Sequence, residues 1–379
     1  MKSPAKQWLT AVICLAAGSS ANIFAQSANV QIYGSVDMGF SHRGDHLTKH
    51  VGSQSRIDSG ILSGSRLGFK GTEDLGNGLK ALFTLEAGFN ADDGQQGQGG
   101  RLFGRQAILG LTGGFGTVVA GRMNTPHKNF LDAIDPFGRG TVGQFSNVLA
   151  AGVKPSGGIS LFDPDRLDNT VAYVTPSWGG FNVTAAYSSQ AFGQEAAGNS
   201  GDNRVFAILP RYANGPLDIG LNYHRIRSED DDSIQVDNWT LAGAYDFGPV
   251  KLAAAYGSNR WNDVLGVNDD SLKLKHWLLG VTVPFGKHAI LASYNQSKLD
   301  WDYQGNQDSG KGRQWALGYT YGFSKRTTFY AALADVHNDK SRQAAPAILG
   351  GAAIVAAGDG AYGGDKYQNG IQFGLRHKF

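Results

Sequence analysis

Apolar and polar residues alternate along many segments of this 379-residue chain. In the last segment, residues 367–379, one set of alternate positions is mostly apolar and the other holds only polar residues and glycine. The same period of two recurs in residues 30–40, 79–90, 239–247 and 314–321. Because successive strand residues point to opposite faces, these segments predict β-strands with an apolar environment on one side and a polar one on the other. They are about ten residues long, enough for a tilted strand to cross a bilayer.

Short and long connections alternate between the predicted strands. Short turns are expected at residues 113–116, 178–180, 247–249, 285–287 and 323–325. Long polar loops are expected at residues 42–55, 91–101, 123–165, 191–203, 228–233, 260–271, 300–311 and 338–366. Eight long loops with seven short turns between them predict sixteen antiparallel strands, and this alternation is typical of an outer-membrane β-barrel. A soluble sandwich or propeller would also contain alternating strands, but neither accounts for the loop pattern.

The first residues have a different character from the rest of the chain. Lys2 and Lys6 precede a short apolar stretch at residues 9–18, and small residues follow up to Ala25. This pattern predicts a signal peptide at residues 1–25 and a single barrel domain at residues 26–379. The only cysteine of the chain, Cys14, lies in the signal peptide, so the mature chain has no cysteine for a disulfide or a thiolate metal site.

Composition and residue spacing argue against several other classes of function. The formal net charge is +2, and removing the two lysines of residues 1–25 brings it to 0. A neutral chain with scattered charges gives no support to nucleic-acid binding. No catalytic, cofactor-binding or metal-binding constellation emerges from the spacing of His, Asp, Glu and Ser, so we expect no enzymatic site and no cofactor.

Four motifs resemble those of the Gram-negative general porins. Residues 65–76, SRLGFKGTEDLG, resemble the second strand and turn of that family, and residues 32–37 resemble its first strand. Residues 135–138, DPFG, are similar to the tip of the family's constriction loop, and residues 374–379 to the closing strand of its betaproteobacterial branch. Pro136 departs from the family pattern, because many members have an acid there, and the third loop, residues 123–165, is long.

The resemblance implies a homotrimer of sixteen-stranded barrels in the cell outer membrane, each with its third loop folded into the lumen. It implies a water-filled channel for passive diffusion of small hydrophilic solutes and ions. It also implies contact with outer-membrane lipid and lipopolysaccharide, and a role for the terminal Phe379 as the signal that the barrel-assembly machinery reads.

Strand parity predicts where the charged side chains point. If Leu67, Ile108 and Val171 face lipid, then Arg66, Arg105 and Arg166 face inward, and a charge facing hydrocarbon would cost about 2–4 kcal/mol. These three arginines match the basic ladder of porins, and two acids on the third loop match the opposing side. The predicted pore constriction is therefore Arg66, Arg105, Arg166, Asp132 and Asp135, with Asp37, Lys80 and Glu86 as further lumen charges. Three cations against two acids predict a weak anion preference.

Three other functions stay open at this stage. A substrate-specific channel for sugars or organic acids would need a line of aromatic side chains along the lumen, and the aromatic residues mostly take the lipid-facing parity. A barrel enzyme would need a nucleophile with a basic partner. An adhesin would not conduct.

The same parity places Gln106 and Gly110 of strand 102–112 on the outer face, where a neighbouring subunit would suit them better than acyl chains.

Overall fold

The structure is a computed structural model, and it describes residues 29–44, 53–138, 140–148, 164–192, 203–228, 235–262, 271–303, 306–338 and 369–379. The predicted signal peptide lies outside these residues, as do most of the loops 42–55, 191–203 and 338–366. No helix in the described residues is long and apolar enough to cross a membrane.

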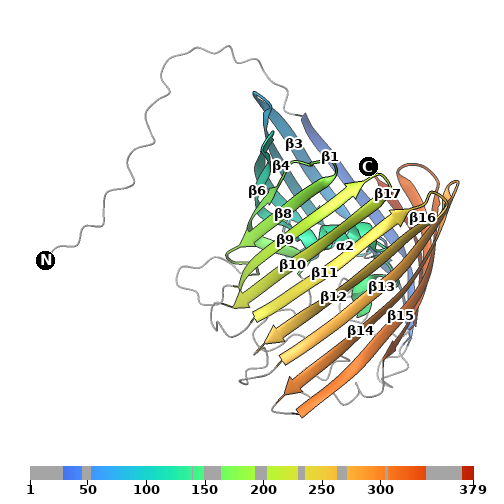
Figure 1. The fold of residues 1–379 in the computed structure, drawn as a ribbon. Helices are drawn as coiled ribbons and strands as arrows, with labels where there is room; N and C mark the ends of the chain where they lie inside the picture. The colour runs from blue at the N-terminus through green and yellow to red at the C-terminus, as the bar shows by residue number, and fades with distance from the viewer. Residues whose placement is uncertain are drawn as a thin grey trace, which may run out of the picture.

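Strands dominate the described chain (Figure 1). In the first half they are β1 (Asn29–Gly44), β2 (Gln54–Ser59), β3 (Arg66–Gly76), β4 (Leu79–Gly88), β5 (Gln106–Gly113), β6 (Gly116–Asn124), β7 (Arg166–Val174) and β8 (Phe181–Ser188). In the second half they are β9 (Asn203–Asn214), β10 (Leu217–Ser228), β11 (Gln235–Asp246), β12 (Lys251–Asn262), β13 (Ser271–Phe285), β14 (His288–Tyr303), β15 (Asn306–Gly322), β16 (Thr327–Asn338) and β17 (Asn369–Lys378). The helices are α1 (Gly97–Gly100), α2 (Pro126–Ile134) and the 3-10 helix η1 (Phe145–Val148).

The strands form one closed ring in which every neighbouring pair is antiparallel. Each strand from β3 to β17 pairs with the next, and β17 pairs with β1. One edge of β1 pairs with both β2 and β3, so these two segments occupy a single position in the ring. Seventeen strands with one shared position give a sixteen-stranded barrel, which confirms the predicted fold class.

The barrel wall has two parts of unequal height. Strands β3–β8, which we call the short wall, contain 8 to 11 residues each. Strands β9–β16, the tall wall, contain 12 to 17 residues each. The predicted loop at 300–311 is wrong, because β14 and β15 continue their ladder to the pair Tyr303 and Asn306. Backbone pairing does not depend on side-chain polarity, so a polar hairpin can extend beyond the apolar band.

The two faces of the wall differ in exposure as the alternation predicts. The exposed face carries large apolar side chains such as Leu241, Leu279, Leu317 and Phe373, whereas their sequence neighbours on the other face are buried. None of the described residues covers the exposed face, and a face of this kind suits lipid or a neighbouring subunit.

The segment 125–148 packs against the buried face of the tall wall. Its helix α2 begins with Thr125, whose hydroxyl accepts a hydrogen bond from the backbone N–H of Lys128 at 3.1 Å. Phe130, Phe137 and Phe145 belong to one apolar cluster that also includes Leu278 of the wall. The third loop therefore contains a helix that the polar reading of residues 123–165 did not predict.

Close approach between this segment and the wall requires glycine. The ring of Phe137 lies 2.7 Å from where a Cβ of Gly318 would be, and Pro136 lies still closer to the Cβ position of Gly280. Both glycines are on the buried face of β15 and β13, so the segment lies on the inner side of the ring, where Figure 1 also places α2. A side chain at either position would push the segment away from the wall.

Hydrogen bonds hold the second half of the segment to both ends of the ring. The backbone N–H of Thr141 donates to the carbonyl of Ile61 at 2.6 Å, and that of Val142 donates to Oε1 of Gln372 at 2.6 Å. The Nδ2 group of Asn147 donates to Oε1 of Gln314 at 3.0 Å. The segment is thus attached to the turn between β2 and β3, to β15 and to β17.

Candidate functional site

Arg66 is the first residue of β3, directly after the turn at residues 60–65. Its Nε donates to the carbonyl oxygen of Gly64 at 3.0 Å, and its guanidinium also contacts the hydroxyl of Ser63. It pairs across the ladder with Ser35, which is buried, so its side chain lies on the inner face, as predicted. Its charge interacts with those of Arg105 and Arg376.

Arg105 lies just before β5 and is 8% exposed. Its Nε donates to Oε1 of Glu86 at 2.7 Å, and the hydroxyl of Tyr33 donates to the other carboxylate oxygen at 2.9 Å. Glu86 is opposite Gln106 in the ladder, so Gln106 shares the inner face of this acid. Arg105 is therefore inside the ring because irregular backbone before the strand turns it inward, and not because of strand alternation.

The predicted parity of strand 102–112 is wrong. Leu109 is 67% exposed and Leu111 is 43% exposed, so they form the outer face, and Ile108 packs inward near Met123 and Ala172. Gln106 and Gly110, which the sequence pattern placed outside, take the inner parity. The error arises because both faces of this strand are partly apolar, so alternation alone does not distinguish them.

Arg166 is the first residue of β7 and follows the third loop. Its charge interacts with those of Arg105, Arg122 and Glu86. Arg66 and Arg166 are therefore both close enough to Arg105 for their charges to interact with its charge. The structure gathers the three predicted arginines into one neighbourhood of the inner wall.

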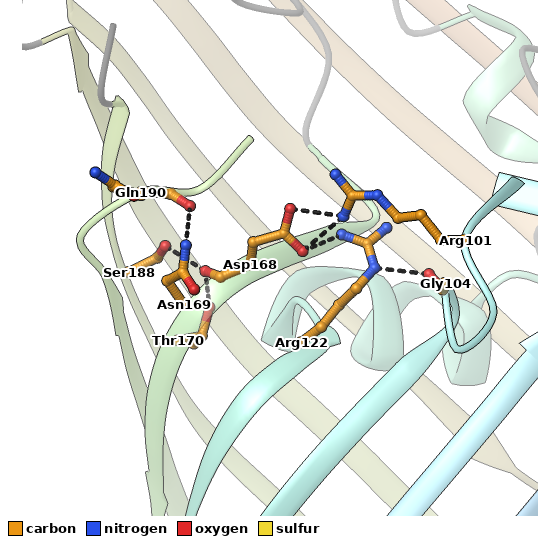
Figure 2. A network of polar contacts seen from close by, with 8 residues as sticks. All are labelled: Arg101, Gly104, Arg122, Asp168, Asn169, Thr170, Ser188 and Gln190. Carbon is orange, nitrogen blue, oxygen red and sulfur yellow. Dashed lines mark hydrogen bonds and ion pairs between the residues drawn. The ribbon is translucent and has the colours of Figure 1, made fainter. Parts of the chain in front are cut away.

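Two further arginines, Arg101 and Arg122, lie in the same neighbourhood and were not predicted. Figure 2 shows both guanidinium groups converging on the carboxylate of Asp168. Nη1 of Arg101 lies 2.9 Å and 2.7 Å from its two oxygens, and Nη1 of Arg122 lies 2.5 Å from Oδ1. Nε of Arg122 also donates to the carbonyl oxygen of Gly104 at 2.7 Å.

A backbone irregularity explains why strand parity does not reveal Arg122. The ladder between β6 and β7 shifts register between Gly121 and Met123, and Gly121 has a φ of +127°. Only glycine adopts that conformation readily, so the backbone departs from regular strand geometry directly before Arg122, and alternation does not fix the direction of this side chain. Arg101 lies in a predicted loop, where alternation gives no direction at all.

We call Arg66, Arg101, Arg105, Arg122, Arg166 and Arg376 the basic cluster. Among the described residues, the carboxylates that interact with it are Asp37, Glu86, Asp165 and Asp168. Six cations against four acids leave an excess of two positive charges on this part of the inner face. Such an excess, held by low-dielectric walls, attracts anions from solution.

The two acids of the third loop have different surroundings. Asp132 forms an ion pair with Lys128 of the same helix at 2.8 Å. Asp135 is 5% exposed, and its two oxygens accept hydrogen bonds from the backbone N–H groups of Phe137 at 3.0 Å and Phe145 at 2.9 Å. Asp135 therefore joins the two ends of the loop tip, a role that the sequence did not indicate.

The other predicted lumen charges also differ from one another in their surroundings. Asp37 is fully buried and accepts hydrogen bonds from the backbone N–H groups of Leu62 and Ser63, at 3.1 Å and 2.8 Å, and from the hydroxyl of Tyr330 at 2.6 Å. It anchors the turn between β2 and β3. Glu86 accepts a hydrogen bond from Arg105 of the basic cluster, whereas Lys80 is exposed on β4 opposite Asp74.

Phe379 closes the ring at the opposite end of the chain. Its backbone N–H and carbonyl exchange hydrogen bonds with those of Gly34, both at 3.1 Å. Its ring lies over Gly34, whose missing side chain makes room for it. Among the described residues, no group of three or more His, Cys, Asp or Glu side chains is placed to hold a metal ion.

A closed sixteen-stranded barrel with an apolar outer face and a charged inner face is the architecture of an outer-membrane barrel protein. The chain belongs to the family of Gram-negative porins, whose sequence profile matches residues 9–341. An outer membrane porin protein of Bordetella pertussis is 36% identical over 252 residues, which cover 60% of this chain and 63% of that protein. Outer membrane porin protein 32 of Delftia acidovorans is 34% identical over 256 residues, covering 65% of this chain and 68% of that one.

Solved structures agree with this assignment. The anion-selective porin from Comamonas acidovorans has a TM-score of 0.74 at 28% identity, over 93% of this chain and all of that chain. The trimer form of OmpT from Vibrio cholerae has a TM-score of 0.64 at 15% identity, over 93% of this chain and all of that one, and it supports the fold alone. The predicted family and the predicted location in the outer membrane are confirmed.

Proposed function

We propose that this protein is a passive diffusion channel for small hydrophilic solutes and ions, with a preference for anions. The observation that carries this proposal is the basic cluster, in which six arginines outnumber four acids on one part of the inner wall. The name of the Comamonas relative, an anion-selective porin, agrees with it. Selection would act by size, polarity and charge, with no fitted binding site and no enzymatic step.

The segment 125–148 is proposed to narrow the channel opposite the basic cluster. Its attachment to the buried face of the wall supports this, because the space it occupies is taken from the interior. Asp132 and Asp135 contribute less negative charge to the opening than a bare count suggests, since Lys128 neutralises one and loop backbone holds the other. The field across the opening would then be dominated by arginine.

Planar-bilayer recordings test the channel directly. The full mature chain should form open pores whose reversal potential in a KCl gradient reports selective passage of chloride. The preference should increase in dilute salt, because charges lining water are screened over roughly 8 Å at physiological ionic strength. A protein that inserts and gives no conductance would refute the channel, and cation selectivity would refute the role of the basic cluster.

We also propose a homotrimer in which the short wall faces the neighbouring subunits. The outer face of β5 presents Ala107, Leu109 and Leu111, and β4 presents Phe83 and Leu85 beside them. Gln106 and Gly110 do not contribute to this outer face, because they take the inner parity. Light scattering after mild extraction should give three copies per particle, and a monomer under those conditions would refute the proposal.

A further inference from the structure

A closed set of contacts joins the loop between β4 and β5 to the inner faces of β6 and β7. Arg101 of this loop binds both carboxylate oxygens of Asp168, and Arg122 binds the same carboxylate (Figure 2). Arg122 also donates from Nε to the carbonyl oxygen of Gly104, whose backbone N–H donates to the carbonyl oxygen of Arg101 at 3.2 Å. The contacts thus return to the residue at which they began. We call Arg101, Gly104, Arg122 and Asp168 the closed network.

The backbone of Asp168 is held independently of the two arginines. Its N–H donates to the carbonyl oxygen of Ala191 at 3.0 Å. Its own carbonyl oxygen accepts hydrogen bonds from the hydroxyls of Thr170 at 2.9 Å and Ser188 at 2.6 Å. The carboxylate therefore projects from a fixed piece of backbone, and it determines where the arginines lie.

The two arginines of the closed network differ in what else holds them. The side chain of Arg122 is 20% exposed and has a second fixed contact at Gly104. The side chain of Arg101 is 44% exposed, and among the described residues its guanidinium binds Asp168 alone. Without the carboxylate, two guanidinium groups would face each other with no counter-charge between them. Arg101, the more exposed and less restrained of the two, would then turn away into solvent.

Gly104 connects the closed network to Arg105, the next residue along the chain. Arg105 lies inside the ring because irregular backbone before β5 turns it inward, and its own N–H donates to the carbonyl oxygen of Glu86 at 3.1 Å. A methyl group on Gly104 would lie 2.6 Å from Cβ of Gln98 and 3.0 Å from Cβ of Arg101, so the loop is tightly packed there. Residues 101–104 are thus held by close packing and by two arginine contacts, and their position sets the direction in which Arg105 enters the lumen.

We propose that Asp168 is a positioning residue of the anion pathway. It binds Arg101 and Arg122 together, fixes residues 101–104 through the closed network, and so directs Arg101 and Arg105 toward a passing anion. A simple count of charges gives Asp168 the opposite effect, because an acid in the lumen repels anions. The inference rests on the proposed channel function and deepens it, since an acid here favours anions by holding cations in place.

Replacing Asp168 by asparagine distinguishes positioning from charge. Loss of one negative charge alone would raise the chloride-to-potassium permeability ratio about twofold, as expected for Asp132→Asn. Asp168→Asn should instead lower the ratio about twofold, because Arg101 leaves the wall and Arg105 loses its fixed direction. Reversal potentials in a KCl gradient measure the ratio. A rise in Asp168→Asn equal to that in Asp132→Asn would overturn the proposal.

A second variant disturbs the closed network without changing any charge. Gly104→Ala places a methyl group against Cβ of Gln98 and of Arg101, so it should displace residues 101–104 and lower the permeability ratio as Asp168→Asn does. Gly114→Ala, at the short turn between β5 and β6, is the matched control, because its methyl group would meet no atom within 4 Å. The control should keep the wild-type ratio. A wild-type ratio in Gly104→Ala as well would overturn the link between the closed network and Arg105.

The effects of Arg101 and Asp168 should be coupled. Arg101→Gln should lower the permeability ratio about twofold in the wild-type background. The same substitution should have little further effect in Asp168→Asn, because Arg101 has already left the wall in that variant. Equal factors in the two backgrounds would show that Arg101 acts without Asp168, contrary to the proposal.

A spin label reports the closed network without any measurement of current. The only cysteine of the chain is Cys14, in the predicted signal peptide, so Leu102→Cys gives the mature chain one label site, on a side chain that is 65% exposed. The label should be restrained in the wild type and in Asp168→Glu, which keeps the carboxylate. It should become mobile in Asp168→Asn, and also in Arg101→Gln, which carries the test if Asp168→Asn does not fold.

The two readouts separate this inference from the proposed function. Equal label mobility in the wild type and in both network variants would overturn the positioning role, whatever the channel conducts. A wild type that inserts and gives no conductance would refute the channel function, and label mobility would still decide whether Asp168 positions the loop. Circular dichroism confirms that every variant compared has the β-sheet content of the wild type.

Discussion

The short wall carries a cluster of cations on its inner face, whereas most cations of the tall wall lie on its outer face. In the short wall, Arg66, Arg122 and Arg166 lie on the inner side. Arg66 and Arg122 donate hydrogen bonds to backbone carbonyls, Arg122 also pairs with Asp168, and Arg166 interacts electrostatically with its neighbours. In the tall wall, the inner side carries both apolar and polar side chains and packs on the segment 125–148, whereas Lys275 and Lys311 point outward. We infer that the short wall sets the electric field inside the barrel, whereas the tall wall holds the segment 125–148 and contacts lipid.

Strands β17 and β1 connect the two walls and close the ring, and we expect the largest effect from a change there. Deleting Phe379 removes the hydrogen bonds and the ring contact with Gly34 that complete the pairing of β17 with β1. The yield of barrel in the outer membrane should collapse, whereas refolding in detergent should decline only slightly, because the other ladders are intact. Equal losses in cells and in detergent would mean that the residue acts through stability alone.

Removing cations from the short wall should have the next largest effect. Arg66→Gln and Arg166→Gln should each lower the chloride-to-potassium permeability ratio about two- to fivefold, since a unit charge contributes about 1 kcal/mol at close range in water and less when screened. Reversal potentials in a KCl gradient measure the ratio. Lys275→Gln on the tall wall is the matched control and should leave it unchanged. An unchanged potential in both arginine variants would show that these arginines do not line the narrowest part.

The two acids of the third loop should respond differently to replacement by asparagine. Asp135→Asn weakens the acceptors that hold Phe137 and Phe145, so it should lower thermal stability and broaden the distribution of single-channel conductance. Loss of a hydrogen bond to a charged group costs about 1.5–3 kcal/mol. Asp132→Asn should leave stability nearly unchanged and shift selectivity about twofold toward anions. If the two variants behaved alike, the distinction between a structural acid and a pore acid would fail.

The smallest effect is expected at Lys80, which is exposed on β4 near the short turns and away from the basic cluster. Lys80→Gln should leave the reversal potential unchanged within error in physiological salt, because its charge is separated from the opening by more than a screening length of about 8 Å. A shift as large as that of Arg66→Gln would place the narrowest part of the channel nearer to this end of the barrel.

Sequence periodicity predicted most of the wall, because a strand between lipid and a polar interior must alternate. The pattern failed where that contrast is weak, as in β5, whose inner residue Ile108 packs on other apolar side chains. It also failed where backbone irregularities redirect side chains, at Gly121 and before Arg105. Those irregularities surround the basic cluster, so the sequence identified Arg66, Arg105 and Arg166 but missed Arg101 and Arg122. It did not single out Arg376 either, because that residue is one of several polar residues on the inner face of the last strand.

The third loop was located from its resemblance to a known loop tip, but its internal structure was not predicted. The helix α2 depends on the cap at Thr125 and on apolar residues that find a partner only in the assembled barrel. Likewise, nothing local to Asp135 indicates that its carboxylate accepts from Phe145, ten residues later. Contacts of this kind arise from tertiary packing and leave little trace in strand periodicity.

The attachment of the segment 125–148 has a consequence for the cell. Its backbone and side chains are fixed to β15, to β17 and to the turn after β2, and two glycines of the wall are shaped to receive it. If this segment forms the narrowest part, as proposed, the aperture has a fixed size and no latch that a signal could release. A bacterium carrying it would adjust its intake by the number of copies that it makes, and not by opening and closing each one.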